Sequence, residues 1–219
     1  KTTTSKDLLD LIFNLVITGL ISARLYHVLI HWSDYASSPL SALKVWEGGL
    51  AIHGGLIGGL LALYFTCRQK HWSFSQWTAW LTPAVAIGQA IGRWGNFFNQ
   101  ELFGQPSTKP WAIPIDLAYR PLDQITTTHF QPLFLYESLG CLFLAIILYI
   151  FNRRQLKTSL IFGTYLIGYG LIRLIMEFFR QDYTWQIANY RWPQLLSLGL
   201  VFIGSFLILK RPSRQTLAK

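Results

Sequence analysis

Residues 133–151 read LFLYESLGCLFLAIILYIF and decide the class of fold, because the run is apolar along most of its length. A helix rises about 1.5 Å per residue, so such a run can cross the hydrocarbon core of a bilayer. Backbone groups in hydrocarbon must pair within their own segment, which favours helices. Similar apolar runs occur at 8–30, 50–65, 77–98, 160–179 and 193–209. We therefore predict an all-α fold, a polytopic transmembrane helical bundle of six spans, as a single domain over residues 1–219.

The composition agrees with a bilayer environment. The chain has 219 residues, of which 52% are hydrophobic and only 13% charged, and this balance argues against a soluble globular protein. The net charge of +9 could indicate nucleic acid, but the placement of the basic residues indicates a membrane topology instead.

Basic residues concentrate on one side of the predicted bundle. They cluster in the segments 1–10, 68–70, 153–157 and 210–219. By the positive-inside rule this side is cytoplasmic, so both chain ends are expected in the cytoplasm. The basic tail KRPSRQTLAK is interpreted as a topology signal that contacts anionic membrane lipids, and no nucleic-acid partner is expected. The opposite segments are nearly neutral, and the longest of them, 100–131, is predicted to be a long exterior loop that forms a lid or platform.

Arginines inside the apolar runs point to a binding site. Arg24, Arg93 and Arg173 lie in the outer halves of the first, third and fifth runs. A charged side chain in hydrocarbon is costly and needs a partner, water or a function. In the third run, spacings of four, three and four place polar residues on one helical face, with Gly88, Gly92 and Gly95 beside them. This polar face comprises Gln89, Arg93, Asn96 and Gln100.

The fifth run carries a second polar face. Tyr169, Arg173 and Glu177 are spaced four residues apart, so Glu177 can hold Arg173. The alternative is a buried ion pair that only fixes the helix register. Glu137, in LYESLG, is a second counter-charge for the arginines or, alternatively, a residue that interacts with the N-terminus of its helix.

A histidine lies among glycines at the outer start of the second run. His53 stands in GGLAIHGGLIGGL, in which the pairs Gly54 with Gly58 and Gly55 with Gly59 have the spacing of close helix packing. Its side chain is a candidate general base at neutral pH. The alternative is a histidine that is simply satisfied at a helix interface.

Together these groups predict an amphipathic, anionic ligand at the outer leaflet. A phospholipid fits, because its phosphodiester suits an arginine pair while its acyl chains stay in the bilayer. The sequence lacks GxSxG, HExxH, a phosphate-binding loop and CxxC, so neither a metal nor a cofactor is implied.

The stretch GRWGNFFNQELFG, residues 92–104, resembles the signature of the bacterial prolipoprotein diacylglyceryl transferase family. The stretches VWEGGLAIHGGLIGG, QPLFLYES and GYGLIRLIMEFFRQD follow the family's order at similar spacing, so the resemblance covers nearly the whole chain. It implies a seven-helix bundle in the bacterial plasma (inner) membrane, of which this chain lacks the first helix and its amino-terminal arm. The family's lipid-facing tyrosine has no counterpart here.

The resemblance also implies a reaction. A diacylglyceryl group moves from phosphatidylglycerol to the lipobox cysteine in the signal peptide of a prolipoprotein, and glycerol phosphate is released. Residues that occupy the family's functional places are His53, Arg93, Asn96, Glu101, Gly104, Tyr169, Arg173 and Glu177, and Arg24 matches a further family position.

The transfer needs a group that takes up the thiol proton and groups that stabilise the departing phosphate. We expect Arg93 and Arg173 to perform the second task and His53 to act as the base. The other residues, with Glu137, are expected to bind substrate. A lipid or anion transporter is the alternative from another class, but its site would lie near the midplane between inverted repeats, and no repeat is visible. A serine intramembrane protease is a further alternative, but this sequence has no suitable serine beside His53.

Overall fold

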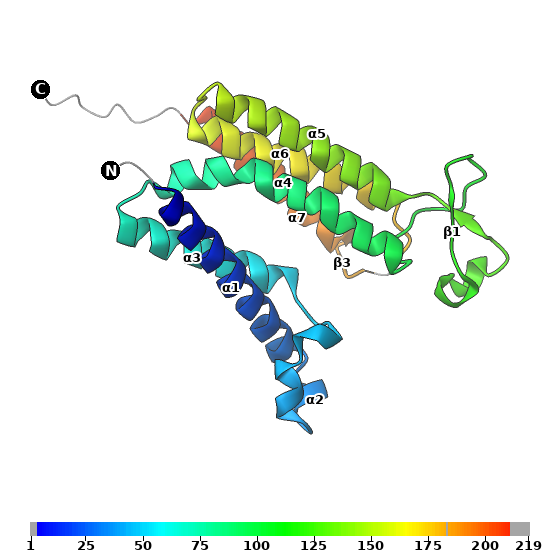
Figure 1. The fold of residues 1–219 in the computed structure, drawn as a ribbon. Coiled ribbons are helices and arrows are strands. Elements are labelled where there is room, and N and C mark those ends of the chain that lie inside the picture. Colours follow the sequence, from blue (N-terminus) through cyan, green and yellow to red (C-terminus); the bar gives the residue numbers. More distant parts are fainter. Residues whose placement is uncertain (1–3, 183, 211–219) are drawn as a thin grey trace, which may run out of the picture. The chain divides into compact units, whose positions relative to one another are not determined.

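The computed structural model describes residues 4–182 and 184–210 and consists mainly of helices (Figure 1). The chain forms two compact units, Lys1–Thr78 and Ala79–Lys219. Most of the basic tail 210–219 lies outside the described residues, so its predicted role as a topology signal stays a prediction.

The first unit is built on two long helices, α1 (Ser5–Ile30) and α3 (Ile52–Lys70). Helix α1 begins with a capping box in which the Thr4 side chain accepts from the Asp7 amide and the Asp7 carboxylate accepts from the Thr4 amide. Between α1 and α3 lie the short helix α2 (Trp32–Tyr35) and two 3-10 helices, Pro39–Leu43 and Val45–Glu47. An ion pair of 2.6 Å between Lys70 and Asp7 joins the far ends of the two long helices.

Small residues set how closely α1 and α3 approach, as the glycine spacing predicts. A methyl group added at Gly54 or Gly58 would overlap atoms of α1, including Ser22. The backbone amide of Ala51 also donates to the carbonyl of Ala23, at 3.1 Å. The close packing expected for Gly54 and Gly58 is therefore confirmed. The second predicted pair does not pack in this way, because no described atom lies within 4 Å of a methyl carbon added at Gly59.

The second unit contains most of α4 (Phe74–Phe98) together with α5 (Leu133–Arg153), α6 (Thr158–Glu177) and α7 (Trp192–Leu209). These four helices run alongside one another (Figure 1). Small and branched side chains of α4, α5 and α6 form the buried core, namely Ala79, Ala86, Leu144, Ala145, Leu148 and Ile161. Helices α6 and α7 approach so closely at Gly163 that an added methyl carbon would lie 2.8 Å from the Gly204 carbonyl oxygen.

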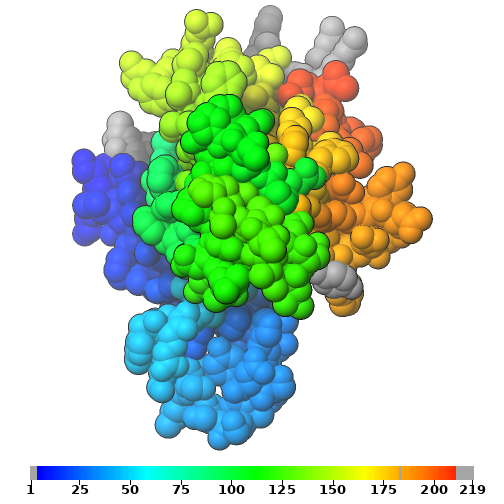
Figure 2. Space-filling view, turned by 90° about the vertical axis from the view of Figure 1, so that its right-hand side faces the viewer, coloured from blue at the N-terminus to red at the C-terminus, as the bar shows by residue number. Residues whose placement is uncertain are grey.

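Two short hairpins complete the second unit. The strands β1 (Ile113–Pro114) and β2 (His129–Phe130) pair antiparallel within the long connection between α4 and α5. This connection also holds the 3-10 helices Leu117–Tyr119 and Leu122–Gln124, and Figure 2 shows it (green) as a raised mass on one face. The strands β3 (Gln186–Ile187) and β4 (Tyr190–Arg191) form the second hairpin, between α6 and α7.

A helix stands at each of the six predicted apolar runs, and the all-helical class is confirmed. Within the described residues, four helices are long and apolar enough to cross a membrane, which agrees with an integral membrane protein. They are Ser5–Ile30, Leu133–Arg153, Thr158–Glu177 and Trp192–Leu209. Helices α3 and α4 are not among these four. Glycine and histidine in α3 and the polar face of α4 lower their apolar character, so the count of six spans stays a prediction, as does the single domain.

Candidate functional site

The polar face predicted on α4 forms, and each of its side chains has a partner in the second unit. The Gln89 amide donates to the Tyr165 hydroxyl of α6 at 3.0 Å. The Arg93 guanidinium donates to the Asn96 side-chain oxygen at 3.3 Å. The Asn96 amide in turn donates to the exposed Glu101 carboxylate at 2.8 Å, just beyond the helix. The face therefore links the helix bundle to the start of the long connection.

Gln100 ends this face in a different way. Gln100 lies just after the helix, with a φ of 50°. Its side chain donates to the Asp116 carboxylate and accepts from the Asp116 backbone amide, both at 2.7 Å. Gln100 therefore anchors the long connection and does not contact the arginines in this structure. Gly88, Gly92 and Gly95 have no atom of the second unit within 4 Å of an added methyl carbon, so no helix of that unit packs closely there.

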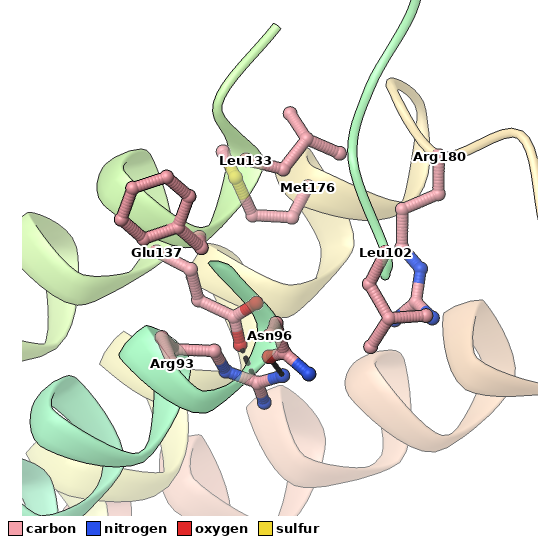
Figure 3. A pocket seen from close by; sticks show the side chains of 8 residues that line it. Arg93, Asn96, Leu102, Leu133, Glu137, Met176 and Arg180 are labelled. Atoms are coloured by element: carbon pink, nitrogen blue, oxygen red, sulfur yellow. Dashed lines mark hydrogen bonds and ion pairs between the residues drawn. The ribbon is translucent and has the colours of Figure 1, made fainter. Parts of the chain in front are cut away.

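Two arginines from different helices meet on one buried carboxylate, Glu137, and Figure 3 shows one of them, Arg93, beside it. The Arg93 side chain of α4 lies 2.9 Å from an oxygen of Glu137 on α5. The Arg173 guanidinium of α6 donates to both Glu137 oxygens at 3.2 Å. Glu137 is only 4% exposed. Its predicted contact as a counter-charge is confirmed, while its part in substrate binding stays a prediction.

A second carboxylate lies one turn beyond Arg173. Glu177 is 2% exposed, and Arg173 approaches it only to 3.8 Å, so Glu137 is the closer partner of Arg173. Glu177 instead lies 2.8 Å from the Arg191 side chain of β4. Arg180 makes a bidentate pair with Asp182, at 2.7 and 2.9 Å.

The sequence reasoning left Arg180 and Arg191 out of the site. Arg180 lies three residues after Glu177, and this helical spacing was the signal that could have placed it there. Arg191 carried no such signal, because the β3–β4 reversal returns it to the end of α6. Its guanidinium donates to the carbonyls of Arg180 and Asp182, at 2.9 and 2.7 Å, which ties the hairpin to the same cluster.

A narrow pocket opens beside the arginine pair, and Figure 3 shows its lining. Polar and apolar side chains share this lining, from Arg93, Asn96, Leu102, Leu133, Phe134, Glu137, Met176 and Arg180. The pocket volume is about 10 Å³, room for a single water molecule. A phosphate group can therefore enter only if lining side chains move, and Leu102, with a φ of 54°, belongs to the connection rather than to the helices.

Gly104 and Tyr169 support the surroundings of the pocket. Gly104 is buried, and an added methyl carbon would lie 3.0 Å from Leu133, which lines the pocket. The ring of Tyr169 stacks on that of Tyr165 at 6.1 Å and packs against the helix core. Among the described residues, neither Gly104 nor Tyr169 makes a hydrogen bond to Glu137, and both shape the site through packing.

The remaining predicted residues, Arg24 and His53, belong to the first unit. Arg24 is 7% exposed, and its guanidinium donates five hydrogen bonds of 2.5 to 3.2 Å, all to backbone carbonyls. These carbonyls belong to Ser41, Ala42, Lys44, Gly48 and Gly49. His53 is exposed in the first turn of α3, with its ring 6.1 Å from that of Tyr26.

Known proteins match this chain over most of its length. The sequence profile of the family described as prolipoprotein diacylglyceryl transferase matches residues 1–210. Three relatives carry the name phosphatidylglycerol–prolipoprotein diacylglyceryl transferase. The protein of Synechocystis is 44% identical over 90% of this chain and 71% of its own length. The proteins of Synechococcus elongatus and Thermotoga maritima are each 42% identical, over 89% and 92% of this chain and 69% and 70% of their own lengths. This chain belongs to the prolipoprotein diacylglyceryl transferase family.

Proposed function

We propose that this chain transfers the diacylglyceryl group of phosphatidylglycerol to the lipobox cysteine of prolipoproteins and releases glycerol phosphate. The observation that carries the proposal is the convergence of Arg93 and Arg173 on one buried anion, Glu137, beside a pocket with both polar and apolar lining. Two guanidiniums from separate helices form a suitable receptor for a phosphodiester. The names of the relatives supply the two substrates.

The reaction is a substitution at carbon. The cysteine sulfur forms a bond to the terminal glyceryl CH₂, and the bond from that carbon to the phosphate oxygen breaks. The electron pair leaves with the phosphate, which gains a negative charge. We expect Arg93 and Arg173 to stabilise this developing charge, because both pair with the Glu137 carboxylate, at 2.9 and 3.2 Å.

The thiol proton needs an acceptor, and His53 is our candidate. Histidine is the side chain that most often acts as a general base near neutral pH. His53 is exposed at the start of α3, so its ring is accessible. Arg24 uses all five of its N–H donors on backbone carbonyls of residues 41–49, a segment called the 41–49 loop below. This supports a role for Arg24 in holding that loop in position rather than in direct contact with lipid.

The remaining predicted residues divide between the lipid site and its support. Asn96 orients Arg93 and connects it to Glu101, while Glu177 holds Arg173 and Arg191 together. Gly104 and Tyr169 keep the connection and the helix core in place. The lipid head group would bind at the pocket, with its acyl chains along the apolar helix surfaces.

The proposed location is the bacterial inner membrane, with six spans, the site toward the outer leaflet and both chain ends in the cytoplasm. The pair of Lys70 and Asp7 lies at the cytoplasmic side in this orientation, and the connection with Glu101 lies outside. Accessibility labelling at Lys109 and at Arg154 tests the orientation, because the two positions should label from opposite sides.

The deciding experiment is a transfer assay with a mass readout. The purified chain in phospholipid nanodiscs is incubated with phosphatidylglycerol and a peptide that carries a lipobox cysteine. We expect the peptide to gain the mass of one diacylglyceryl group, and a matched peptide with serine in place of cysteine to stay unchanged. A chain that binds the lipid but leaves the cysteine peptide unmodified would contradict the proposal and favour a lipid-binding or transport role.

A further inference from the structure

Glu137 occupies the place between the two arginines that a substrate phosphate would need. Its carboxylate forms an ion pair with Arg93 on one side and accepts hydrogen bonds from Arg173 on the other, and it is 4% exposed. The pocket beside it has a volume of only about 10 Å³. A head group must therefore share the arginines with Glu137 or displace it from one of them.

The charges around the pocket nearly cancel within the described residues. Four arginines and three carboxylates form the cluster, namely Arg93, Arg173, Arg180, Arg191, Glu137, Glu177 and Asp182. One positive charge is left unmatched. Glu101 reaches the arginines only through Asn96 and is exposed, so water and salt screen its charge.

We propose that Glu137 sets the charge of the anion that this site accepts, and that the site prefers a singly charged phosphodiester to a doubly charged phosphate monoester. The inference rests on the proposed function, of which it names one determinant of specificity. A phosphodiester carries one negative charge and completes the neutrality of the cluster. A monoester carries close to two charges at neutral pH, because its second pKa is about 6, and the second charge faces the Glu137 carboxylate.

The negative charge of Glu137 also assists turnover, because it favours release of the phosphate product. When the carbon–oxygen bond breaks, the phosphate changes from a diester with one negative charge to a monoester that carries up to two. The product then meets the carboxylate of Glu137 within a buried site, where like charges repel strongly. Glu137 therefore weakens the binding of the leaving group once transfer is complete, and the arginines return to their internal partner.

The test compares two soluble head-group analogues by titration calorimetry, which needs no turnover. The analogues are glycerophosphoglycerol, a diester with one charge, and glycerol phosphate, a monoester. The protein is the whole chain in phosphatidylcholine nanodiscs at pH 7.5. In the Glu137→Gln variant we expect the Kd of glycerol phosphate to fall about tenfold relative to that of the diester, because one like charge is removed at contact distance.

Glu177→Gln is the matched control. Glu177 is an equally buried carboxylate of the same cluster, but it does not line the pocket and approaches Arg173 only to 3.8 Å. We expect Glu177→Gln to change the ratio of the two Kd values less than Glu137→Gln does. An equal shift in both variants would mean that the total charge of the cluster, and not Glu137, sets the preference, and this overturns the proposal.

Two further outcomes keep the proposal open to refutation. If the ratio of the two Kd values is the same in Glu137→Gln as in the wild-type chain, the proposal about Glu137 is contradicted directly. If that variant does not fold, the wild-type chain still tests it, because a more than tenfold preference for glycerol phosphate over the diester would be incompatible with the charge balance. The proposed function fails on a separate observation, the absence of a diacylglyceryl adduct on the cysteine peptide, so the two failures can be told apart.

Discussion

Arg24 of the first unit is a buried helical arginine and Arg173 of the second unit a half-buried one, and their partners differ in kind. Arg24 donates only to carbonyls of the 41–49 loop, and all five of its donors are used. Arg173 contacts the carboxylates of Glu137 and Glu177. The carbonyls are fixed in one loop, whereas a carboxylate on a side chain can move aside for another anion. The partner of such an arginine, more than its burial, therefore indicates whether it can bind a ligand.

The first prediction concerns His53, which belongs to the same unit as Arg24 and is the candidate base. If His53 is the base, His53→Asn keeps hydrogen bonding at similar size but cannot accept a proton, so we expect turnover to fall by roughly 100-fold to 10,000-fold. Lipid affinity should be nearly unchanged. The measurement is the rate of peptide modification between pH 6.5 and 9.

The pH dependence separates the base from a scaffold role for His53. The cysteine of the peptide ionises by itself as the pH approaches about 8.5, so the deficit of His53→Asn should narrow at high pH. His53→Gln should behave in the same way. A small deficit, or one that is constant over this range while lipid binding weakens, would show that His53 positions the head group.

The second prediction concerns the arginine pair. Arg93→Lys and Arg173→Lys keep the positive charge but lose the planar fork, which should raise the barrier by about 2 to 4 kcal/mol, by analogy with a lost oxyanion donor. The loss should appear in kcat, measured with the transfer assay. Arg154→Lys, at an exposed arginine after α5, is the matched control and should keep its rate. Near-normal rates in both lysine variants of the pair would show that the bidentate geometry is not needed.

The third prediction replaces Arg24, the buried arginine of the first unit, by lysine. Arg24→Lys loses several of the five hydrogen bonds to the 41–49 loop, and partly buried carbonyls are left without donors. We expect a loss of about 2 to 3 kcal/mol in stability, seen as a lower Tm in detergent. The rate per folded molecule should fall less than in Arg173→Lys. A loss of kcat as large as at Arg173, with an unchanged Tm, would place Arg24 at the substrate.

The sequence predicted the helices well because apolar runs report directly on the bilayer. The run 133–151 became Leu133–Arg153, and the run 193–209 became Trp192–Leu209. Helix α3 was harder, since its glycines carry little hydropathy, but their spacing identified its packing on α1. Local periodicity was therefore sufficient for the elements and for one of their contacts.

The site was predictable only where its members share a helix. The spacing of Arg93 and Asn96, and of Arg173 and Glu177, placed each pair on one face. The link from β4 back to Glu177 depends on a chain reversal, so Arg191 could not be found in this way. The five carbonyls around Arg24 were also beyond prediction, because backbone groups leave no mark on the pattern of side chains.

The last and smallest prediction tests the packing on which the first unit depends. Gly58 faces α1, and an added methyl group would overlap the Ser22 side chain and lie 2.8 Å from the Thr18 carbonyl oxygen. Gly59, the next residue, has nothing within 4 Å of the same added carbon and serves as the control. Gly58→Ala should therefore lower stability by about 1 to 3 kcal/mol, the usual cost of overpacking a close contact. Gly59→Ala should be neutral or gain up to about 1 kcal/mol, since alanine favours helix over glycine. Thermal unfolding of both variants in the same detergent gives the comparison. Equal Tm values would mean that α1 can shift away from α3 at little cost, and the 41–49 loop that Arg24 holds would then have to shift with α1.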